Sequence, residues 1–414
     1  MHKKQKHNLK IGVIGLGYVG LSVLYLFSSK YDCLGFDVDN LRMRELNNGV
    51  DQKGILSSSE LNALLLRCKI TCMWKDLSDC NFYIICVPTP IDNKKVPDTT
   101  SLEKACLSLS QIISVGDIIV FESTVYPGAT EELCIPHLES GSNMKSNCDF
   151  FVGYSPERVN IGDHEHGLAN TPKIVSAQNE ETLEVICSVY HEVFNDDIIK
   201  ASSIKTAEAA KMYENVQRDV LIALANQYSE YCRVEGLDIQ EVTDCASTKW
   251  NFAKVFPGLV GGHCISVDPY YLLARAKDKD TTLQLVETAR SINEAKVEHV
   301  AKRIIDFVIK SNPKRVDLKI LILGFSYKRN VSDIRNTKIA DLIALLSMSI
   351  DRIDCYDPLV NKEDVKNSYG LDVITSMSDI LKDEYDLAII AVNHNCIAGA
   401  SYNAKMTINL EKFI

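Results

Sequence analysis

Residues 10–20 read KIGVIGLGYVG, and this stretch decides the class of fold. The apolar run at 10–14 predicts a buried strand, and three glycines follow it at the start of a helical pattern. In a GxGxxG turn the first glycine permits the tight turn, the second lets a pyrophosphate approach the backbone, and the third allows close helix–strand contact. The start of the helix presents free N–H groups to phosphate. The stretch therefore predicts a dinucleotide site, formed by Gly15, Gly17, Tyr18, Val19 and Gly20.

An acidic residue stands where this kind of site needs one. Asp37 follows the second predicted strand, at 33–36, near the expected spacing of about 20 residues from the glycines. A carboxylate there binds the ribose hydroxyls and repels the 2′-phosphate of NADP, so we predict NAD as the cofactor. Asp39 is the less favoured ribose partner, and a tight turn without any ligand is the alternative for the whole motif.

The first third of the chain alternates apolar runs with amphipathic stretches, which is typical of βαβ units and a parallel sheet. The apolar runs predict strands at 10–14, 33–36, 82–87, 118–121, 150–154 and 173–176. The amphipathic stretches predict helices at 58–68 and 101–113.

Two long helical patterns and a second α/β unit follow. The long patterns cover 204–235 and 281–310, with a loop rich in Gly and Pro at 256–269 between them. Beyond Pro313 we predict strands at 319–323, 352–356 and 387–392, and a helix at 338–347. The predicted fold class is α/β, with two Rossmann-like, doubly wound domains joined by a central region of long helices. The predicted boundaries are 1–200, 201–312 and 313–414.

Charge and hydropathy exclude several classes of partner. The chain has 414 residues and a net charge of −10, which does not favour nucleic acid or anionic membranes. No stretch is long and apolar enough to span a bilayer. The basic start and the apolar run at 11–27 mimic a secretory signal, but four glycines interrupt the run and no small-residue cleavage site follows.

The cysteine usage indicates a reducing compartment. Fourteen cysteines occur without any CxxC pair, which is the spacing that zinc fingers and ribbons need. Many lie in apolar runs, as Cys86 does, and are read as small buried hydrophobic side chains. We therefore expect a cytoplasmic protein.

The second stretch that carries chemistry is PGLVGGHC at 257–264. Three glycines and a proline in so short a span indicate a backbone that lies close to a ligand. Cys264 ends this loop, His263 precedes it, and Asp268 follows four residues later. A thiol there can attack an aldehyde to give a thiohemiacetal, which can release a second hydride. A buried structural cysteine is the alternative.

Further charged residues have positions that suit a site. Glu157 and Arg158 follow the strand at 150–154. Lys211 and Asn215 lie four residues apart on one face of the long helix, where a solvated face is the alternative. Lys328 follows a glycine turn of the second α/β unit, a position from which a cation can contact phosphate.

One run has the composition of a metal site. Residues 163–166 read DHEH, but they lie among ordinary charged loop residues. A metal ion needs three or four convergent ligands, and no further set is evident, so no metal is predicted.

Together these motifs resemble the UDP-glucose/GDP-mannose dehydrogenase family over nearly the whole chain. That family has two Rossmann-like domains joined by a helical region that forms the dimer core. The resemblance implies NAD on the first domain, a UDP-sugar on the second, and a homodimer through the central long helix. The matching segments are the glycine turn at 15–20, VPTP at 87–90, EST at 122–124, SPER at 155–158, AEAAK at 207–211 with Asn215, the Cys264 loop with Asp268, and Lys328 with Asp333 and Arg335.

The resemblance also implies roles for single residues. The catalytic set would be Cys264, Lys211, Asn215, Asp268, Glu157 and Thr124. Cofactor contacts beyond the glycine turn would be Asp37, Arg42, Thr89, Thr124 and Arg335. Substrate contacts would be Glu157, Arg158, Lys211, Asn215, Arg218, Phe256, Gly258, Gly261 and Lys328.

Within the family, the sequence is most similar to the bacterial UDP-N-acetylhexosamine 6-dehydrogenases of surface-polysaccharide pathways. The segments that carry this likeness are ENVQRD at 214–219, KWNF at 249–252, and 257–271. Departures are Ser266, Arg329 and the short tail beyond Asn395.

The likeness implies a four-electron oxidation of C6 of UDP-GlcNAc or UDP-GalNAc through a Cys264 thioester, for capsule or O-antigen synthesis. The alternatives are a UDP-glucose or UDP-ManNAc 6-dehydrogenase, a dehydrogenase that transfers a single hydride, and a non-catalytic nucleotide-binding regulator.

Overall fold

The computed structural model describes residues 9–158, 170–194, 197–311, 317–399 and 401–414. The chain forms two compact units. Unit 1 contains the described residues up to Glu214 together with Tyr270–Asp280, and unit 2 contains Asn215–Pro269 and Thr281–Ile414. The boundary falls within one continuous helix, α7 (Ile204–Glu235).

Unit 1 is built on an eight-stranded sheet in the order β3-β2-β1-β4-β5-β6-β7-β8. Its neighbouring strands run parallel except β6 and β7, which are antiparallel. β4 and β5 are buried on both faces, which explains why they read as continuous apolar runs. The strands are β1 (Lys10–Ile14), β2 (Asp32–Phe36), β3 (Lys69–Thr71), β4 (Phe82–Ile85), β5 (Ile118–Phe121), β6 (Phe151–Tyr154), β7 (Lys173–Ala177) and β8 (Ile198–Lys200).

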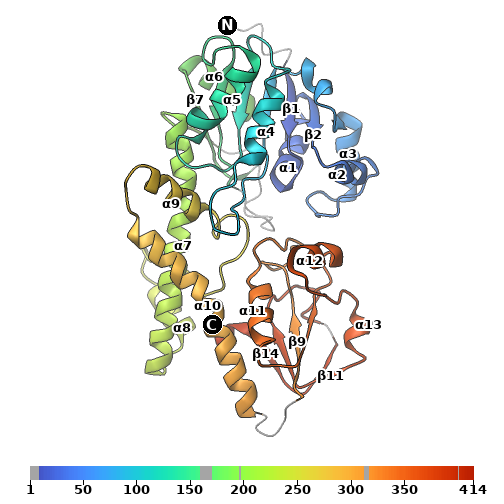
Figure 1. Ribbon diagram of the computed structural model, residues 1–414, viewed down its shortest axis with the longest axis vertical. Coiled ribbons are helices and arrows are strands. Elements are labelled where there is room, and N and C mark those ends of the chain that lie inside the picture. The colour runs from blue at the N-terminus through green and yellow to red at the C-terminus, as the bar shows by residue number, and fades with distance from the viewer. Residues whose placement is uncertain (1–8, 159–169, 195–196, 312–316, 400) are drawn as a thin grey trace. The chain divides into compact units, whose positions relative to one another are not determined.

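Helices cover this sheet, and Figure 1 shows α1 beside the blue strands and α4 and α5 in cyan to green. Local signals fix their starts: Ser57 and Glu60 form a capping box at α3, and the Asn179 side chain accepts from the Thr182 N–H at α6. The helices of unit 1 are α1 (Tyr18–Phe27), α2 (Asn40–Asn47), α3 (Ser58–Arg67), η2 (Trp74–Asp79), α4 (Thr100–Leu109), η3 (Thr130–Cys134), α5 (Ile135–Ser142), α6 (Glu180–His191), the first part of α7, and α9 (Asp268–Asp278) from Tyr270 onward.

Unit 2 holds a smaller parallel sheet in the order β10-β9-β12-β14, and a two-stranded sheet of β11 and β13. Helices α10 and α11 bury Val300, Ile304 and Leu342 against Ile320 and Ile322 of β9. The strands are β9 (Lys319–Leu323), β10 (Arg352–Tyr356), β11 (Glu384–Tyr385), β12 (Leu387–Ile390), β13 (Asn403–Ala404) and β14 (Thr407–Asn409). The helices are the rest of α7, α8 (Ile239–Ala246), α10 (Gln284–Ser311), α11 (Lys338–Leu346), α12 (Lys362–Tyr369), α13 (Met377–Ile380) and η5 (Leu410–Phe413).

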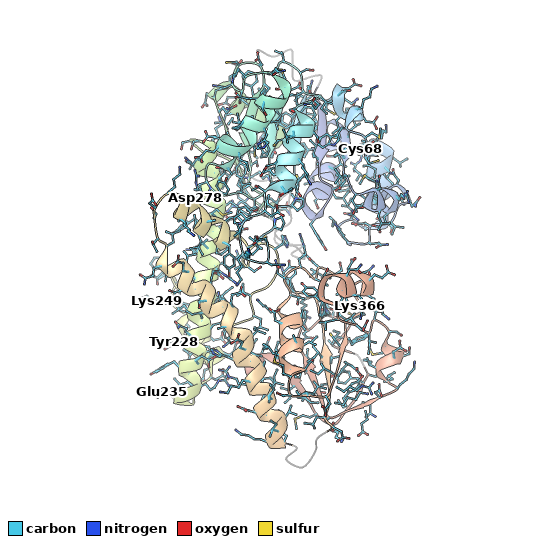
Figure 2. All side chains as sticks on the ribbon, in the orientation of Figure 1. Cys68, Tyr228, Glu235, Lys249, Asp278 and Lys366 are labelled. Carbon is cyan, nitrogen blue, oxygen red and sulfur yellow. The ribbon has the colours of Figure 1, made fainter. Side chains whose placement is uncertain are left out.

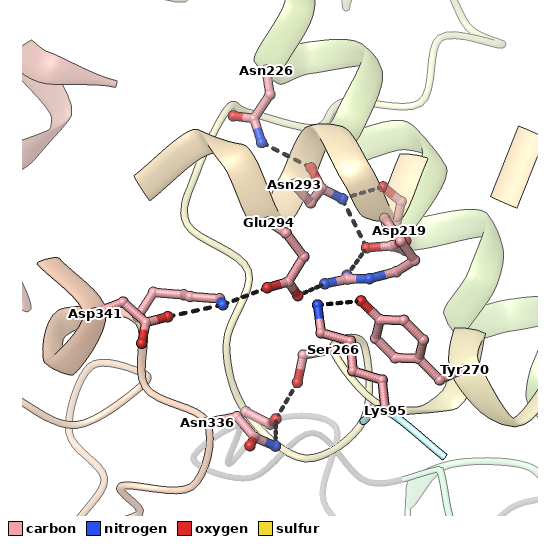
Figure 3. Close-up of polar contacts among 12 residues, drawn as sticks. Lys95, Asp219, Asn226, Ser266, Tyr270, Asn293, Glu294, Asn336 and Asp341 are labelled. Carbon is pink, nitrogen blue, oxygen red and sulfur yellow. Dashed lines mark hydrogen bonds and ion pairs between the residues drawn. The ribbon is translucent and has the colours of Figure 1, made fainter. Parts of the chain in front are cut away.

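A buried polar network joins α7 to α10 within unit 2, and Figure 3 shows it in close-up. Asp219 accepts from the guanidinium of Arg290 at 2.5 Å and from the amide of Asn293 at 2.8 Å. Asn293 in turn accepts from Asn226 at 2.9 Å. Buried polar groups of this kind fix one register of the two helices, because any other register leaves them unpaired.

The predicted α/β fold with parallel sheets, a first Rossmann sheet, a long central helix and a second α/β unit is confirmed. The boundaries differ by a few residues. The strand predicted at 82–87 ends at Ile85, and the helix predicted at 101–113 ends at Leu109, where Ser110 caps it. The loop predicted to reach 269 ends earlier, because Asp268 already opens α9. Over the described residues, no helix is both long and apolar enough to cross a membrane.

Candidate active site

The turn after β1 has the geometry of a phosphate-binding loop. Gly15 has φ +93°, and a Cβ there would lie 2.9 Å from the carbonyl oxygen of Cys86. A Cβ on Gly20 would lie 1.7 Å from the carbonyl oxygen of Gly15, so this glycine lets α1 pack on the turn. A Cβ on Gly17 would meet nothing within 4 Å. The fold therefore needs the first and third glycines, whereas the second leaves open space for a ligand at the helix start.

Asp37 stands at the end of β2 beside this turn. Its Oδ2 accepts from the Leu16 N–H at 2.7 Å, and its Oδ1 accepts from the Asp39 N–H at 3.0 Å. These bonds hold the carboxylate beside the glycine turn, where lone pairs of both oxygens are left for ribose hydroxyls. Asp39 caps α2 by accepting from the Leu41 and Arg42 N–H groups, which gives it a structural task of its own.

Arg42 is a buried cation at the same turn. Its Nη1 pairs with Asp51 at 2.7 Å and its Nε donates to the carbonyl oxygen of Leu16 at 3.3 Å. Its Nη2 is buried and has no hydrogen-bond partner among the residues that the structure describes. An unpaired buried donor costs free energy, so an acceptor from a bound molecule fits this position. The open face of Gly17, the oriented Asp37 and this donor suit NAD.

Two threonines lie at the carboxyl edge of the same sheet. Thr89 follows β4 and Thr124 follows β5, and the Thr89 hydroxyl donates to the Thr124 carbonyl oxygen at 2.7 Å. Both side chains are half-buried. In an open parallel sheet, ligands bind at this carboxyl edge, as both predicted roles require.

Glu157 and Lys211 are brought together in unit 1. The ammonium of Lys211, on α7, donates to the backbone carbonyl oxygen of Glu157, and both side chains are buried. Arg158 pairs with Glu214 at 3.0 Å, and Lys211 lies 3.7 Å from the same Glu214. Lys211 and Arg158 therefore gather positive charge around Glu157, as an anionic substrate would need.

A second buried charge cluster adjoins Glu157, and the sequence analysis missed it. Lys173 pairs with Glu122 at 2.8 Å and with Glu157 at 3.2 Å, and the Tyr190 hydroxyl donates to Glu122 at 2.6 Å. The sequence does show that Glu122 directly follows the buried strand β5 and that Lys173 opens β7, and these two positions are the signal that could have revealed the cluster.

Asn215 and Asp268 are brought together in unit 2, beside Cys264. The Asn215 amide donates to the Asp268 carboxylate at 2.6 Å, and both side chains are buried. The Asp268 N–H donates to the Cys264 carbonyl oxygen at 2.8 Å, so the cysteine precedes the first turn of α9. Lys211 and Asn215 lie one turn apart on α7, as the spacing predicted.

The Cys264 loop rests on the segment that follows β9. A Cβ on Gly261 would lie 2.7 Å from the Asn336 carbonyl oxygen, and Gly262, at φ +85°, packs under the Tyr327 ring. The amide of Asn336 donates to the Gly262 carbonyl oxygen at 2.9 Å, a contact that Figure 3 also shows. At the other end of the loop, Gly258 exchanges two hydrogen bonds with the side chain of Asn226. These contacts explain the glycines and fix the backbone that carries the thiol.

His263 holds an acidic partner next to the thiol. Its Nδ1 lies 3.5 Å from Asp333, and Arg335 binds both groups. Burial alone would lower the pKa of His263, but hydrogen bonds to Asp333 and Cys264 outweigh it and raise the pKa to about 9. Burial would raise the pKa of Asp333, yet His263 and Arg335 hold it well below its usual range. Arg335 therefore lies beside the Cys264 loop, in unit 2.

The remaining predicted residues differ in surroundings. Phe256 is partly exposed under the ammonium of Lys254, Gly258 has open space, and Lys328 is half-buried in the loop after β9. Arg218 is exposed and has no ion pair among the described residues, because Glu214 binds Arg158 and Asp219 binds Arg290.

No metal site is found among the residues that the structure describes. The DHEH run at 163–166 lies outside those residues.

A Rossmann sheet with an open glycine turn, and a thiol on a rigid glycine-rich loop beside buried acids, define a dinucleotide-dependent dehydrogenase with a cysteine at its site. Comparison with known proteins gives the family. Residues 9–194, 205–295 and 321–413 match the NAD-binding, central and UDP-binding domains of the UDP-glucose/GDP-mannose dehydrogenase family.

Similar proteins match over almost their whole length. UDP-N-acetyl-D-glucosamine 6-dehydrogenase of Salmonella typhi is 42% identical over 93% of this chain and 90% of its own. The protein of the same name from Pseudomonas aeruginosa is 41% identical over 94% and 91%. A solved structure of a UDP-D-ManNAc dehydrogenase from Pyrococcus horikoshii superposes with a TM-score of 0.86 at 30% identity, covering 98% of this chain and 96% of that one.

The chain belongs to the UDP-glucose/GDP-mannose dehydrogenase family. This confirms the predicted NAD-dependent oxidoreductase of UDP-sugars.

Proposed function

We propose that the protein oxidises the C6 hydroxyl of a UDP-N-acetylhexosamine, UDP-GlcNAc or UDP-GalNAc, to a carboxylate, with Cys264 as the nucleophile. The observation that carries this proposal is the placement of Cys264. Most cysteines of the chain are buried, whereas Cys264 is partly exposed on a fixed glycine-rich loop with His263 and Asp333 beside it. A partly exposed thiol next to a cationic imidazole is the usual setting of a reactive cysteine.

The reaction balances as two oxidations and one hydrolysis. Bound NAD supplies the hydride acceptor for each oxidation. The alcohol at C6 loses a hydride and a proton to give an aldehyde, and the sulfur of Cys264 adds to its carbon. The thiohemiacetal loses the second hydride and becomes a thioester, and water then breaks the C–S bond to release the carboxylate and the thiol. One sugar therefore consumes two NAD and one water and releases two NADH.

The chain's own residues have complementary parts in this scheme. Lys211, buried beside Glu157, stabilises the oxyanion that develops on C6, because a fixed cation acts more strongly in a water-poor site. Asn215 orients Asp268 and donates to the same oxyanion. Glu157 or Asp268 accepts the proton of the attacking water, and Thr124 positions that water or the cofactor.

The choice of substrate rests on the relatives. The proteins from Salmonella typhi and Pseudomonas aeruginosa are named for UDP-N-acetyl-D-glucosamine, and both match more than nine-tenths of this chain. Arg218 supplies an exposed donor on α7, seven residues after Lys211, where it can bind the acetamido carbonyl or a neighbouring hydroxyl.

The organisation follows the three matched segments. We propose an NAD domain over 1–200, a central domain over 201–312 and a UDP domain over 313–414. Lys328, Phe256, Gly258 and Gly261 contact the UDP-sugar, and Arg335 contacts the cofactor. The enzyme works in the cytoplasm, where its buried thiols stay reduced, and its uronic acid product serves capsule or O-antigen synthesis.

Stoichiometry and a substrate panel test this function. We expect two NADH per sugar with UDP-GlcNAc or UDP-GalNAc, and a kcat/KM roughly tenfold to a hundredfold lower for UDP-glucose, which leaves the acetamide donor unused. NADH absorbance against known amounts of UDP-GlcNAc, UDP-GalNAc, UDP-ManNAc and UDP-glucose measures both quantities. A yield of one NADH per sugar would refute the thioester mechanism. A preference for UDP-glucose or UDP-ManNAc would refute the proposed substrate.

The variant Arg218→Leu tests whether Arg218 is the residue that selects the acetamido substrates. If Arg218 reads the acetamide, the variant loses most of the preference while its rate with UDP-glucose stays close to that of the wild type. A preference that survives in Arg218→Leu keeps the substrate and shows that another residue selects it.

We also propose that the enzyme is a homodimer through α7. Leu224, Tyr228, Tyr231 and Val234 are exposed and recur every three or four residues, so they form one apolar stripe on the second half of this helix. Figure 2 labels Tyr228 and Glu235 on this part of α7. An exposed apolar stripe of this length favours a partner, and a second copy related by a twofold axis presents the same stripe in the opposite direction.

Introducing negative charge into the stripe tests the dimer. We expect Tyr228→Glu with Tyr231→Glu to give a monomer by light scattering, because each copy would bury two unpaired carboxylates at the interface. The matched control is Leu66→Glu, an apolar residue of α3 that is 90% exposed outside the stripe and should leave the mass unchanged. A dimer that persists in the double variant would place the interface elsewhere.

A further inference from the structure

The antiparallel pair in the first sheet brings a lysine to the edge where the carboxylates lie. Glu122 follows β5 and Glu157 follows β6, so both leave the carboxyl edge of the parallel part of the sheet. β7 runs antiparallel to β6, which places its first residue, Lys173, at that same edge. A parallel β7 would have carried Lys173 to the opposite edge.

The ammonium of Lys173 lies between the two carboxylates. It donates to Glu122 at 2.8 Å and to Glu157 at 3.2 Å. Lys173 and Glu122 are each 2% exposed and Glu157 is 8% exposed, so these charges are far from bulk water. The Tyr190 hydroxyl, from α6, donates to the other oxygen of Glu122 at 2.6 Å. Glu122 therefore binds Lys173 on one oxygen and Tyr190 on the other.

The far side of Lys173 is closed by aromatic rings. Its nitrogen lies 5.9 Å from the centre of the Tyr190 ring and 5.4 Å from that of Phe194, within the range of cation–π attraction. Burial alone would lower the pKa of Lys173, but Glu122 and Glu157 outweigh it and raise the pKa above its usual range. The lysine is therefore a fixed cation that has no room to swing away.

Glu157 is held from both ends. Its Oε1 accepts from the Arg158 N–H at 2.6 Å and its Oε2 accepts from Lys173, while Lys211 binds its backbone carbonyl oxygen. Burial raises the pKa of Glu122, and the charge of Glu157 adds to this effect while Lys173 opposes it. The titratable and charged groups that lie around Glu157 are Glu122, Lys173, Tyr190, Cys86, Arg158 and Lys211.

We propose that Lys173 is a positioning residue for Glu157, held in place by Glu122 and Tyr190, and that this chain of contacts keeps the Glu157 carboxylate oriented for proton transfer. The proposal rests on the proposed function, because it supplies the reason why a buried carboxylate at this site can accept a proton from water. Without the ammonium, two carboxylates would face one buried space, and one of them would retain a proton to higher pH.

Lys173→Met is the direct test, because methionine keeps the apolar stem and removes the charge. We expect kcat to fall by roughly a hundredfold, since general-base catalysis contributes about that much or more, while NAD binding is unchanged. The acid limb of the kcat profile should move up by roughly one pH unit or more. Lys173→Arg should recover most of kcat and bring the acid limb of the pH profile back to its wild-type position. The matched control is Lys200→Met, on β8, whose ammonium pairs with Glu184 at the surface and should change neither quantity.

A purely structural ion pair predicts other results. It would lower the melting temperature of Lys173→Met but leave the acid limb at its wild-type pH, and that outcome overturns the proposal. If Lys173→Met fails to fold, Tyr190→Phe removes only the hydroxyl that holds Glu122, and the limb should move in the same direction by less. An unmoved limb in that variant also overturns it.

A crystal structure of the folded variant gives a readout that needs no activity. We expect the Glu157 carboxylate to leave its wild-type position in Lys173→Met and to return to it in Lys173→Arg. A carboxylate that stays in place overturns the positioning role. Wild-type enzyme that oxidises no UDP-sugar would instead refute the proposed function, and the crystal structures would still decide the role of Lys173.

Discussion

Replacing Cys264 by serine is expected to lower steady-state turnover on the order of a thousandfold or more while NAD binding is retained. A serine hydroxyl adds poorly to an aldehyde unless a base deprotonates it, and it cannot form the thioester from which the second hydride leaves. The first oxidation does not need the thiol. Rapid mixing should therefore still show NADH from the first step, followed by a very slow phase.

The control for this variant is Cys245→Ser. Cys245 is an exposed cysteine that takes part in none of the site contacts described above. The same substitution there should therefore leave turnover unchanged. A near-normal rate in Cys264→Ser would remove the covalent mechanism, whereas a loss of NAD binding would show that the substitution disturbs the fold.

The fold could be predicted from the sequence because its signals are local. β1, β5 and β9 are dominated by apolar residues, and their predicted bounds are those observed. The glycines that start α1 form a recognisable GxGxxG spacing, although the contact that requires Gly15 comes from Cys86, far along the chain. Helix α7 lacks any Gly or Pro, and its predicted bounds are those observed. Where a boundary was displaced, as at the end of α4, the run of apolar residues continued past the last helical turn.

The candidate site could be predicted only in part. Spacing along α7 pairs Lys211 with Asn215, and the glycine loop marks Cys264, because both signals lie within one element. Glu122 and Lys173 are 51 residues apart and meet only because β7 reverses direction, which no local pattern announces. The same holds for His263 and Asp333, whose contact depends on how the loop after β9 packs against Gly262.

Alanine at Gly20 and at Gly17 should separate folding from cofactor binding. A Cβ on Gly20 would lie 1.7 Å from the Gly15 carbonyl oxygen and 3.1 Å from the Cys86 Cβ, and no rotamer relieves a clash that involves the Cβ itself. The backbone of α1 or of the turn must move, so we expect Gly20→Ala to lower the free energy of unfolding by about 3 kcal/mol or more. Thermal or denaturant unfolding measures this loss.

The substitution Gly17→Ala adds the same methyl group, but at a position where it meets open space. Gly17 has φ −78°, which alanine adopts freely, and its Cβ would meet nothing within 4 Å, so stability should change by less than about 1 kcal/mol. That open space is where a pyrophosphate approaches the backbone, and a methyl there should weaken NAD binding roughly tenfold to a hundredfold. Calorimetric titration with NAD measures the effect. If Gly17→Ala binds NAD as tightly as the wild type, the pyrophosphate does not lie against Gly17, and the cofactor assignment of the turn fails even though its fold is right.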